Sequence, residues 1–301
     1  MMNTMPTAVA GEELQRRVAQ FVRHASTEIT TNDAGLLPEL VTLLPPQATI
    51  YVAHIPKATL DDVVGVAIKV QDAGLRASPH IIARRLESEG ALRTALRRLR
   101  DRGVEQVLLV AGDREQPAGP FSSTLDVLDS GVFDDAGITQ IGVAGHPEGH
   151  PAVETPALFE ALQRKQAFAD RSGLKVHIAT QFGFNAAAVV EWYRELEQRG
   201  IRLPVHAGIA GPTPMTRLMK YAMQCGIGAS LQAMMKNPKL LGSLTRGNAA
   251  ADGMLADLVR LGASPDAHSG IVKPHFFCFG GVLATVKWMR AVVNGEHQID
   301  A

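Results

Sequence analysis

The 301-residue sequence has few of the features that would place it in a specialised class of protein. It has only two cysteines, Cys225 and Cys278, both in apolar surroundings, which favours a cytoplasmic protein with reduced thiols over a disulfide-stabilised one. Acidic and basic residues number 30 each, so the basic excess typical of nucleic-acid-binding proteins is absent. No apolar run reaches the roughly 18 residues of a membrane span, and the N-terminus lacks a signal-peptide pattern.

The sequence does contain enough apolar residues for a large core, 46% of the total, in alternating short and long segments. The short apolar runs predict strands, and the longer amphipathic runs predict helices, including a long helical pattern over Asn237–Gly262. Several helices end at a glycine just before the next strand, as expected for a left-handed C-cap. The predicted strands are His24–Thr30, Thr49–His54, Arg76–Ile82, Gln106–Ala111, Gln140–Ala144, Val176–Phe182, Val205–Ile209 and His275–Phe279.

Repeated units of strand, helix and glycine predict an α/β protein with a parallel sheet. With eight strands, we expect a closed (β/α)8 TIM barrel that occupies residues 1–301 as a single domain. The alternative is an open doubly wound sheet, which normally has a glycine-rich phosphate-binding turn after its first strand. The sequence contains neither GxGxxG nor GxxxxGK[ST], which weakens that alternative.

Polar side chains follow six successive predicted strands. Ligands of a parallel barrel bind at the carboxyl ends of the strands, so we expect these side chains to share one site. Each alone has an ordinary explanation, such as a buried core histidine or a helix cap, but so many together are hard to explain by packing. The residues are Glu28, His54, His80, Asp113, His146, Glu148, His150 and Gln181.

The spacing of His146 and His150 raises the question of a metal site, because histidines four residues apart on a helix can share a metal ion. Here Pro147 and Pro151 interrupt any helix, and no third ligand lies nearby in the sequence. We therefore expect a rigid loop that lines a ligand, and no metal.

Eight motifs occur in order between about Ser26 and Trp288: STEIT, ASPHI, VAGDREQPAG, IGVAGHPEGHP, LQRKQAF, ATQFGFN, HAGIAG and HFFCFG. In this order and spacing they resemble the catalytic domain of the methylenetetrahydrofolate reductase family. The GD loop, the HPExHP loop and the TQF strand end are the most specific. The resemblance implies a (β/α)8 barrel that holds FAD and passes a hydride between NADH or NADPH and the one-carbon unit of a tetrahydrofolate derivative.

The resemblance also implies roles for individual residues. Glu28 falls on the catalytic acid, which protonates the folate so that the methylene bridge opens to an iminium ion. Asp113 falls on an aspartate that hydrogen-bonds the pterin beside the flavin, and Gln181 on a glutamine that binds the pterin edge. Positions that contact FAD in the family correspond to His54, His80, Gly112, Asp113, Phe121, Ser122, His146, His150 and Lys165.

Several positions depart from the family pattern. Ala111 stands where the family usually has an arginine before the GD pair. Leu158 and Ala161 stand where the family usually has the aspartate and asparagine that hold the adenosine of FAD. Gly281 stands where the family usually has an arginine that helps to hold folate. The first strand continues as ITTND, where the family usually has aromatic and proline residues. The acid is therefore kept, whereas several anchors for the cofactor and the folate tail are changed.

Two interpretations of the chemistry remain open. In the first, FAD is retained and the enzyme interconverts 5,10-methylene- and 5-methyltetrahydrofolate, with methyl oxidation in a demethylation pathway as one direction. In the second, the hydride passes directly between NAD(P)H and folate. A third reading, from another class, is a folate-binding barrel that assists a methyltransferase, which Glu28 argues against because binding alone needs no buried acid. The resemblance leaves room for a homo-oligomer.

Overall fold

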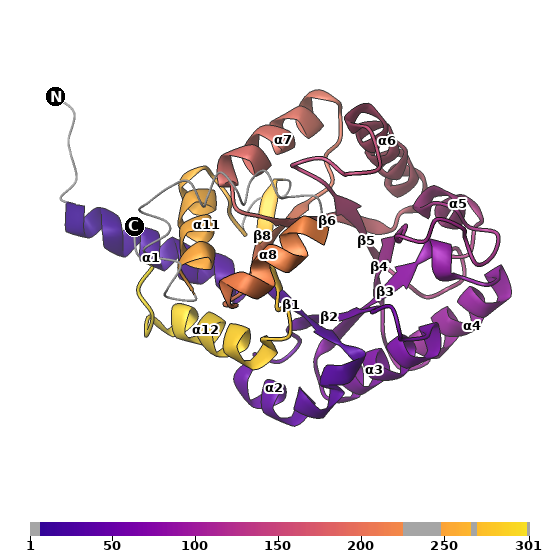
Figure 1. Cartoon of the computed structure of the whole chain (residues 1–301), viewed down its shortest axis with the longest axis horizontal. Coiled ribbons are helices and arrows are strands. Elements are labelled where there is room, and N and C mark those ends of the chain that lie inside the picture. Colours follow the sequence, from indigo (N-terminus) through magenta and orange to yellow (C-terminus); the bar gives the residue numbers. More distant parts are fainter. Residues whose placement is uncertain (1–6, 225–247, 266–269, 300–301) are drawn as a thin grey trace.

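The computed structural model describes residues 7–224, 248–265 and 270–299, which form a closed barrel of parallel strands in sequence order (Figure 1). Each strand pairs with the next along the chain, and β8 pairs with β1 to close the barrel. The predicted TIM barrel is thereby confirmed. The strands are β1 (Ser26–Thr30), β2 (Thr49–Ala53), β3 (Arg76–Ile82), β4 (Gln106–Val110), β5 (Gln140–Gly145), β6 (Lys175–Gly183), β7 (Val205–Ala210) and β8 (Ile271–Phe277).

Helices surround this barrel, with α1 crossing outside it before the first strand (Figure 1). Polar caps start several of them: in α3, Thr59 and Asp62 bond reciprocally to each other's backbone N–H groups, and Ser123 and Asp126 do the same in α5. The described helices are α1 (Thr7–Arg23), α2 (Leu37–Leu43), α3 (Leu60–Asp72), α4 (Glu89–Arg100), α5 (Thr124–Asp129), α6 (Thr155–Ser172), α7 (Ala186–Gln198), α8 (Met215–Gln224), α11 (Ala249–Arg260) and α12 (Val282–Asn294), with short 3-10 helices at Thr31–Leu36 and Ala83–Arg85.

The hydrophobic core lies between the strands and the helices. Alternate side chains of each strand point outward into this layer, where residues such as Ile29, Val52 and Ile81 are almost fully buried. The inward-pointing side chains are of another kind. The apolar cluster inside the barrel is small, consisting of Tyr51, Leu108 and Ala179 with Val110 packed against it. Most of the remaining interior positions are polar.

The last strand differs from its prediction. It runs over Ile271–Phe277 and not over His275–Phe279. Lys273 and Pro274 interrupt the apolar pattern on which the prediction relied, but Lys273 points to the polar interior and Pro274 pairs in register with Ala207. Phe279 has a φ of +46°, a left-handed conformation that ends the strand.

Two predicted features fall partly outside the described residues. Cys225 and residues 237–247 of the long helical pattern lie there, whereas the end of that pattern forms α11. Cys278 is a buried free thiol. In the described part of the chain, no helix combines the length and apolar character needed to span a bilayer.

Candidate active site

A cavity of about 310 Å³ opens at the carboxyl ends of the strands. Its walls come from β3, β4, β5, β6 and β8, together with the loop after β5. Four side chains predicted from the sequence line this cavity, namely His80, His146, His150 and Gln181. The structure therefore brings together residues more than 100 positions apart, at the end of the barrel where ligands of this fold bind.

Glu28 lies in the middle of β1, in register with Tyr51 of β2. Its neighbour Ile29 packs into the outer core, so the alternation of the strand turns Glu28 toward the barrel interior. Burial, with a smaller contribution from the nearby charge of Asp33, raises the pKa of the Glu28 carboxyl from 4.5 to about 8. Glu28 is therefore a protonated acid at neutral pH, as an acid catalyst requires.

His54, His80 and Arg85 each carry a buried nitrogen with no hydrogen-bond partner among the described residues: His54 Nδ1, His80 Nε2 and Arg85 Nε. Burial lowers the pKa of His54 and, helped by the charge of His54, lowers that of His80 to about 4. Unsatisfied buried nitrogens are uncommon in native proteins. Three in one region indicate a place where a ligand supplies the missing partners.

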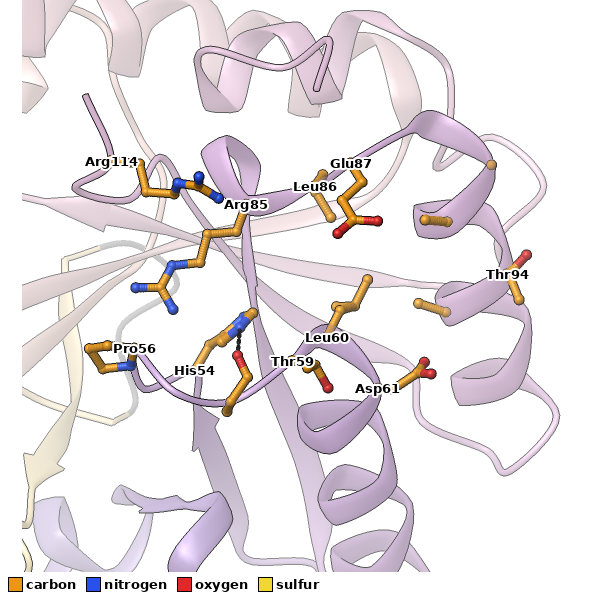
Figure 2. Close-up of a pocket in the computed structure, with 14 residues that line it drawn as sticks. His54, Pro56, Thr59, Leu60, Asp61, Arg85, Leu86, Glu87, Thr94 and Arg114 are labelled. Carbon is orange, nitrogen blue, oxygen red and sulfur yellow. Dashed lines mark hydrogen bonds between the residues drawn. The ribbon is translucent and has the colours of Figure 1, made fainter. Parts of the chain in front are cut away.

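Beside these residues lies a larger cavity of about 850 Å³, between the starts of α3 and α4. Figure 2 shows His54 and Arg85 on one side of it and Thr94 of α4 on the other. His54 Nε2 bonds the carbonyl of Ala58 at 3.0 Å, which fixes the ring at the cavity edge. This cavity has room for the part of a ligand that extends beyond the barrel mouth.

The loop after β5 places His146 and His150 against each other, with ring centroids 4.9 Å apart in an edge-to-face arrangement. Burial lowers the pKa of His146 to about 4, with smaller contributions from the charges of His150 and Lys165. Lys165 lies on α6, where burial lowers its pKa to about 8. No group of three or more potential metal ligands occurs in the described part of the chain.

Asp113 and Gly112 lie on the loop after β4, outside the lining of the mouth cavity. The Asp113 side chain is 86% exposed, and its Oδ1 lies 3.7 Å from Arg85 Nη2. Gly112 has a φ of +91°, and a Cβ there would collide with Ile82 Cγ2, so only glycine fits this turn. The turn presents Asp113 to solvent.

The remaining predicted cofactor positions are occupied by local structure. Phe121 is buried in the outer core. Ser122 Oγ donates a hydrogen bond to Asp126 at the start of α5. Leu158 and Ala161 are half-buried on α6 and offer no polar side-chain atom. Gly281, which immediately precedes α12, offers no side chain to hold folate.

The backbone around Gln181 is irregular. The pairing of β6 with β7 shifts register between Ala179 and Phe182, a bulge that turns Gln181 to the cavity. Thr180 Oγ1 accepts a hydrogen bond from the Gly208 N–H at 2.8 Å. A Cβ on Gly208 would meet the carbonyl oxygens of Thr180 and Gln181, so glycine allows the close approach of the two strands.

Sequence reasoning missed a group of aromatic polar residues deeper in the barrel. Tyr51 Oη and His177 Nε2 are 2.8 Å apart, and the His177 ring stacks on His206 at 4.0 Å between centroids. Burial lowers the pKa of His177 to about 3 and those of His206 and His275 well below their ordinary value. The signal in the sequence is a histidine at an inward position of each of the last three strands, in VHIAT, VHAGIA and KPHFF.

The fold and the site define a (β/α)8 barrel with a cavity at the carboxyl ends of its strands and, on the inner face of β1, a carboxyl group whose pKa is raised to about 8. The chain belongs to the methylenetetrahydrofolate reductase family, since the sequence model of that family matches residues 54–239, more than half of the chain. This membership supports an oxidoreductase that acts on a folate one-carbon unit.

Solved structures with a similar chain path come from other enzymes. Dihydropteroate synthase from Thermus thermophilus has 15% identity and a TM-score of 0.48, covering 91% of this chain and 92% of that one. Sialic acid aldolase from Ruminococcus gnavus has 12% identity and a TM-score of 0.43, covering 78% of each chain. At this level of similarity they say nothing about substrate.

Proposed function

We propose that this protein interconverts 5,10-methylenetetrahydrofolate and 5-methyltetrahydrofolate, with Glu28 as the acid. The observation that carries the proposal is the desolvated Glu28 carboxyl on the inner face of β1, whose pKa of about 8 keeps it protonated near neutral pH. A barrel that only binds folate has no need of such an acid. Family membership supplies the substrate class, and the mouth cavity supplies a place for the pterin.

The residues of the chain divide the chemistry between them. Gln181 binds the pterin edge through its amide, which offers a donor and an acceptor together. Glu28 gives its proton to N10 of the folate. The bond from N10 to the methylene carbon then breaks, and an iminium ion remains between that carbon and N5. A hydride then adds to that carbon and completes the methyl group. In the methyl-oxidising direction the Glu28 carboxylate takes the proton back.

FAD is the first candidate for the hydride carrier. Its flavin ring would supply a two-electron relay between the nicotinamide and the folate. The unsatisfied nitrogens of His54 and His80 would face the ring end of this cofactor, and Lys165, whose charge acts on His146, would pair with a phosphate. Asp113, whose Oδ1 lies 3.7 Å from Arg85 Nη2, would hydrogen-bond the pterin beside the flavin ring.

Direct transfer from NADH or NADPH is the second candidate, and it is favoured because the residues that hold the adenosine of FAD in the family are replaced here. Leu158 and Ala161 cannot hydrogen-bond a ribose or an adenine, and Ser122 is already bonded to Asp126. The mouth cavity of about 310 Å³ is at the lower end of the usual range for ligand sites. This volume suits a pterin with the single ring of a nicotinamide better than a pterin with the larger ring system of a flavin. The histidine nitrogens serve a nicotinamide amide equally well.

An absorption spectrum of the purified protein, followed by an activity assay, tests these candidates. A flavin band that 5-methyltetrahydrofolate bleaches supports transfer through FAD. Colourless protein that oxidises NADH or NADPH in the presence of 5,10-methylenetetrahydrofolate supports direct transfer. Colourless protein that binds folate without either reaction overturns the proposed function and favours a binding role.

A further inference from the structure

A third cavity lies at the opposite end of the barrel, where the strands begin. It measures about 690 Å³ and is lined by the end of α1, the turn before β2, the starts of β2 and β3, the first half of β8 and one side of α12. We call it the basal pocket. No aspartate or glutamate is among its lining residues, whereas five basic ones are: Arg23, His24, Arg76, Lys273 and Arg290.

The cations of this pocket differ from most arginines elsewhere on the described surface. Arg98 lies 2.6 Å from Asp61, and Arg164 lies 2.8 Å from Asp129. By contrast, no side-chain hydrogen bond or ion pair joins Arg23, Arg76, Lys273 or Arg290 to any described residue. In a chain with zero net charge, this is a local excess of positive charge without counter-charge.

Lys273 is the innermost of these cations. It points into the barrel from β8, and burial together with the charge of Arg76 lowers its pKa to about 8. A partly desolvated ammonium group without an anion is unfavourable, and an anionic ligand reduces this cost by pairing with it. The other wall of the pocket is apolar and includes the half-buried side chains of Leu43, Leu44 and Val293.

We propose that the basal pocket binds a small organic phosphate, with its phosphate group on Lys273 and Arg76 and its apolar body on the wall formed by Leu43, Leu44 and Val293. The volume lies within the range of small-molecule sites. Because the pocket and the mouth cavity share no lining residue, the two ligands bind without competition. The inference is independent of the proposed function.

Isothermal titration calorimetry with inorganic phosphate and with phenyl phosphate tests the proposal. We expect both to bind with an affinity in the millimolar range or better, and phenyl phosphate to bind more tightly because its ring adds apolar contact. Lys273→Met is expected to weaken phenyl phosphate binding at least about tenfold, the value of one charge-assisted hydrogen bond. Lys273→Arg keeps the charge and is expected to retain most of the affinity.

Arg202→Gln is the matched control. Arg202 is an exposed arginine just before β7, at the same end of the barrel but outside the pocket. We expect its substitution to leave binding unchanged. Should Lys273→Met fail to fold by circular dichroism, Arg76→Gln replaces it, because Arg76 is exposed at the start of β3.

Three results would overturn the proposal. They are an absence of binding to the wild-type protein, an equal loss of affinity in Arg202→Gln and Lys273→Met, and displacement of phenyl phosphate by 5-methyltetrahydrofolate. Glu28→Gln separates this inference from the proposed function, since it is expected to abolish folate turnover and leave phenyl phosphate binding intact.

Discussion

The outward and inward faces of the same barrel strands are made of different residues. On β1, Ile29 is 1% exposed and packs against the helices, whereas its neighbour Glu28 points to the interior. On β6, Ile178 faces outward and His177 inward. The interior of a TIM barrel is usually filled by valine, isoleucine and leucine. Here it holds histidines, glutamines and a glutamate.

This difference separates stability from chemistry. The outer layer buries the large apolar side chains whose removal from water drives folding. The inner layer contributes little apolar area and holds ionisable groups in a medium that keeps Glu28 protonated and its histidines neutral. Substitutions on the two faces should therefore have different consequences.

The largest expected effect is on the inner face. Glu28→Gln removes the proposed proton donor and is expected to lower folate turnover by about 10²–10⁴-fold, the usual contribution of a general acid. Steady-state assays with 5,10-methylenetetrahydrofolate measure this, and Glu12→Gln, at an exposed position on α1, serves as the control. Unchanged turnover in a folded Glu28→Gln protein would remove Glu28 from the mechanism.

The outer face is expected to govern stability. Ile29→Ala leaves a cavity in the outer core and should lower the free energy of unfolding by about 2–5 kcal/mol. Val41→Ala on α2, where the side chain is 40% exposed, should change it by no more than about 0.5 kcal/mol. Urea unfolding compares the two. Equal losses would mean that the outer layer does not carry the stability.

A smaller effect is expected from the hydrogen bond between Tyr51 and His177. Tyr51→Phe keeps the ring but removes the hydroxyl, which leaves His177 Nε2 without its partner and should cost about 1–2 kcal/mol. Tyr193→Phe removes a hydroxyl on α7 whose hydrogen bond to Glu197 is exposed to solvent, and it should cost less. A larger loss in Tyr193→Phe than in Tyr51→Phe would contradict the value assigned to the interior bond.

A smaller change in stability than that of Tyr51→Phe is expected at Asp113. Its side chain is 86% exposed and its Oδ1 lies 3.7 Å from Arg85 Nη2, so Asp113→Asn should alter the free energy of unfolding by less than about 1 kcal/mol. The same substitution should weaken pterin binding, seen as a higher KM for folate, or shift the potential of a bound flavin. If KM and potential both stay at their wild-type values, Asp113 has no role at the ligand.

The barrel could be predicted from the sequence because each strand-helix unit is local. Apolar runs, polar caps and glycines after the helices specify each element within a short window, and Arg76–Ile82 has the same bounds in prediction and structure. Strand β8 was misplaced because Lys273 and Pro274 break the apolar pattern. That pattern assumes an apolar interior, which this barrel lacks.

The candidate site was predictable in part. Its strand-end residues follow from the fold, and His80, His146, His150 and Gln181 do meet in one cavity. The partnership of Tyr51 with His177 was not predictable, because it spans 126 residues and depends on closure of the barrel. The exposure of Asp113 likewise depends on a loop geometry that the motif does not encode.

The protonation of Glu28 also makes stability depend on pH. Its pKa is raised in the folded protein, from 4.5 to about 8, so the folded state holds this proton more tightly than the unfolded state. The stabilisation from Glu28 is complete below pH 4.5 and is lost as the pH rises through about 8. Glu28→Gln should remove this part of the pH dependence of urea unfolding.

The central claim is that the inner face keeps Glu28 protonated beside the folate. Carbon-13 NMR of protein labelled at the glutamate carboxyls measures this directly, with the Glu28 resonance identified by its absence from the Glu28→Gln spectrum. We predict a titration midpoint near pH 8. A midpoint near the ordinary value of 4.5 would show an ionised carboxylate at neutral pH and would contradict the account.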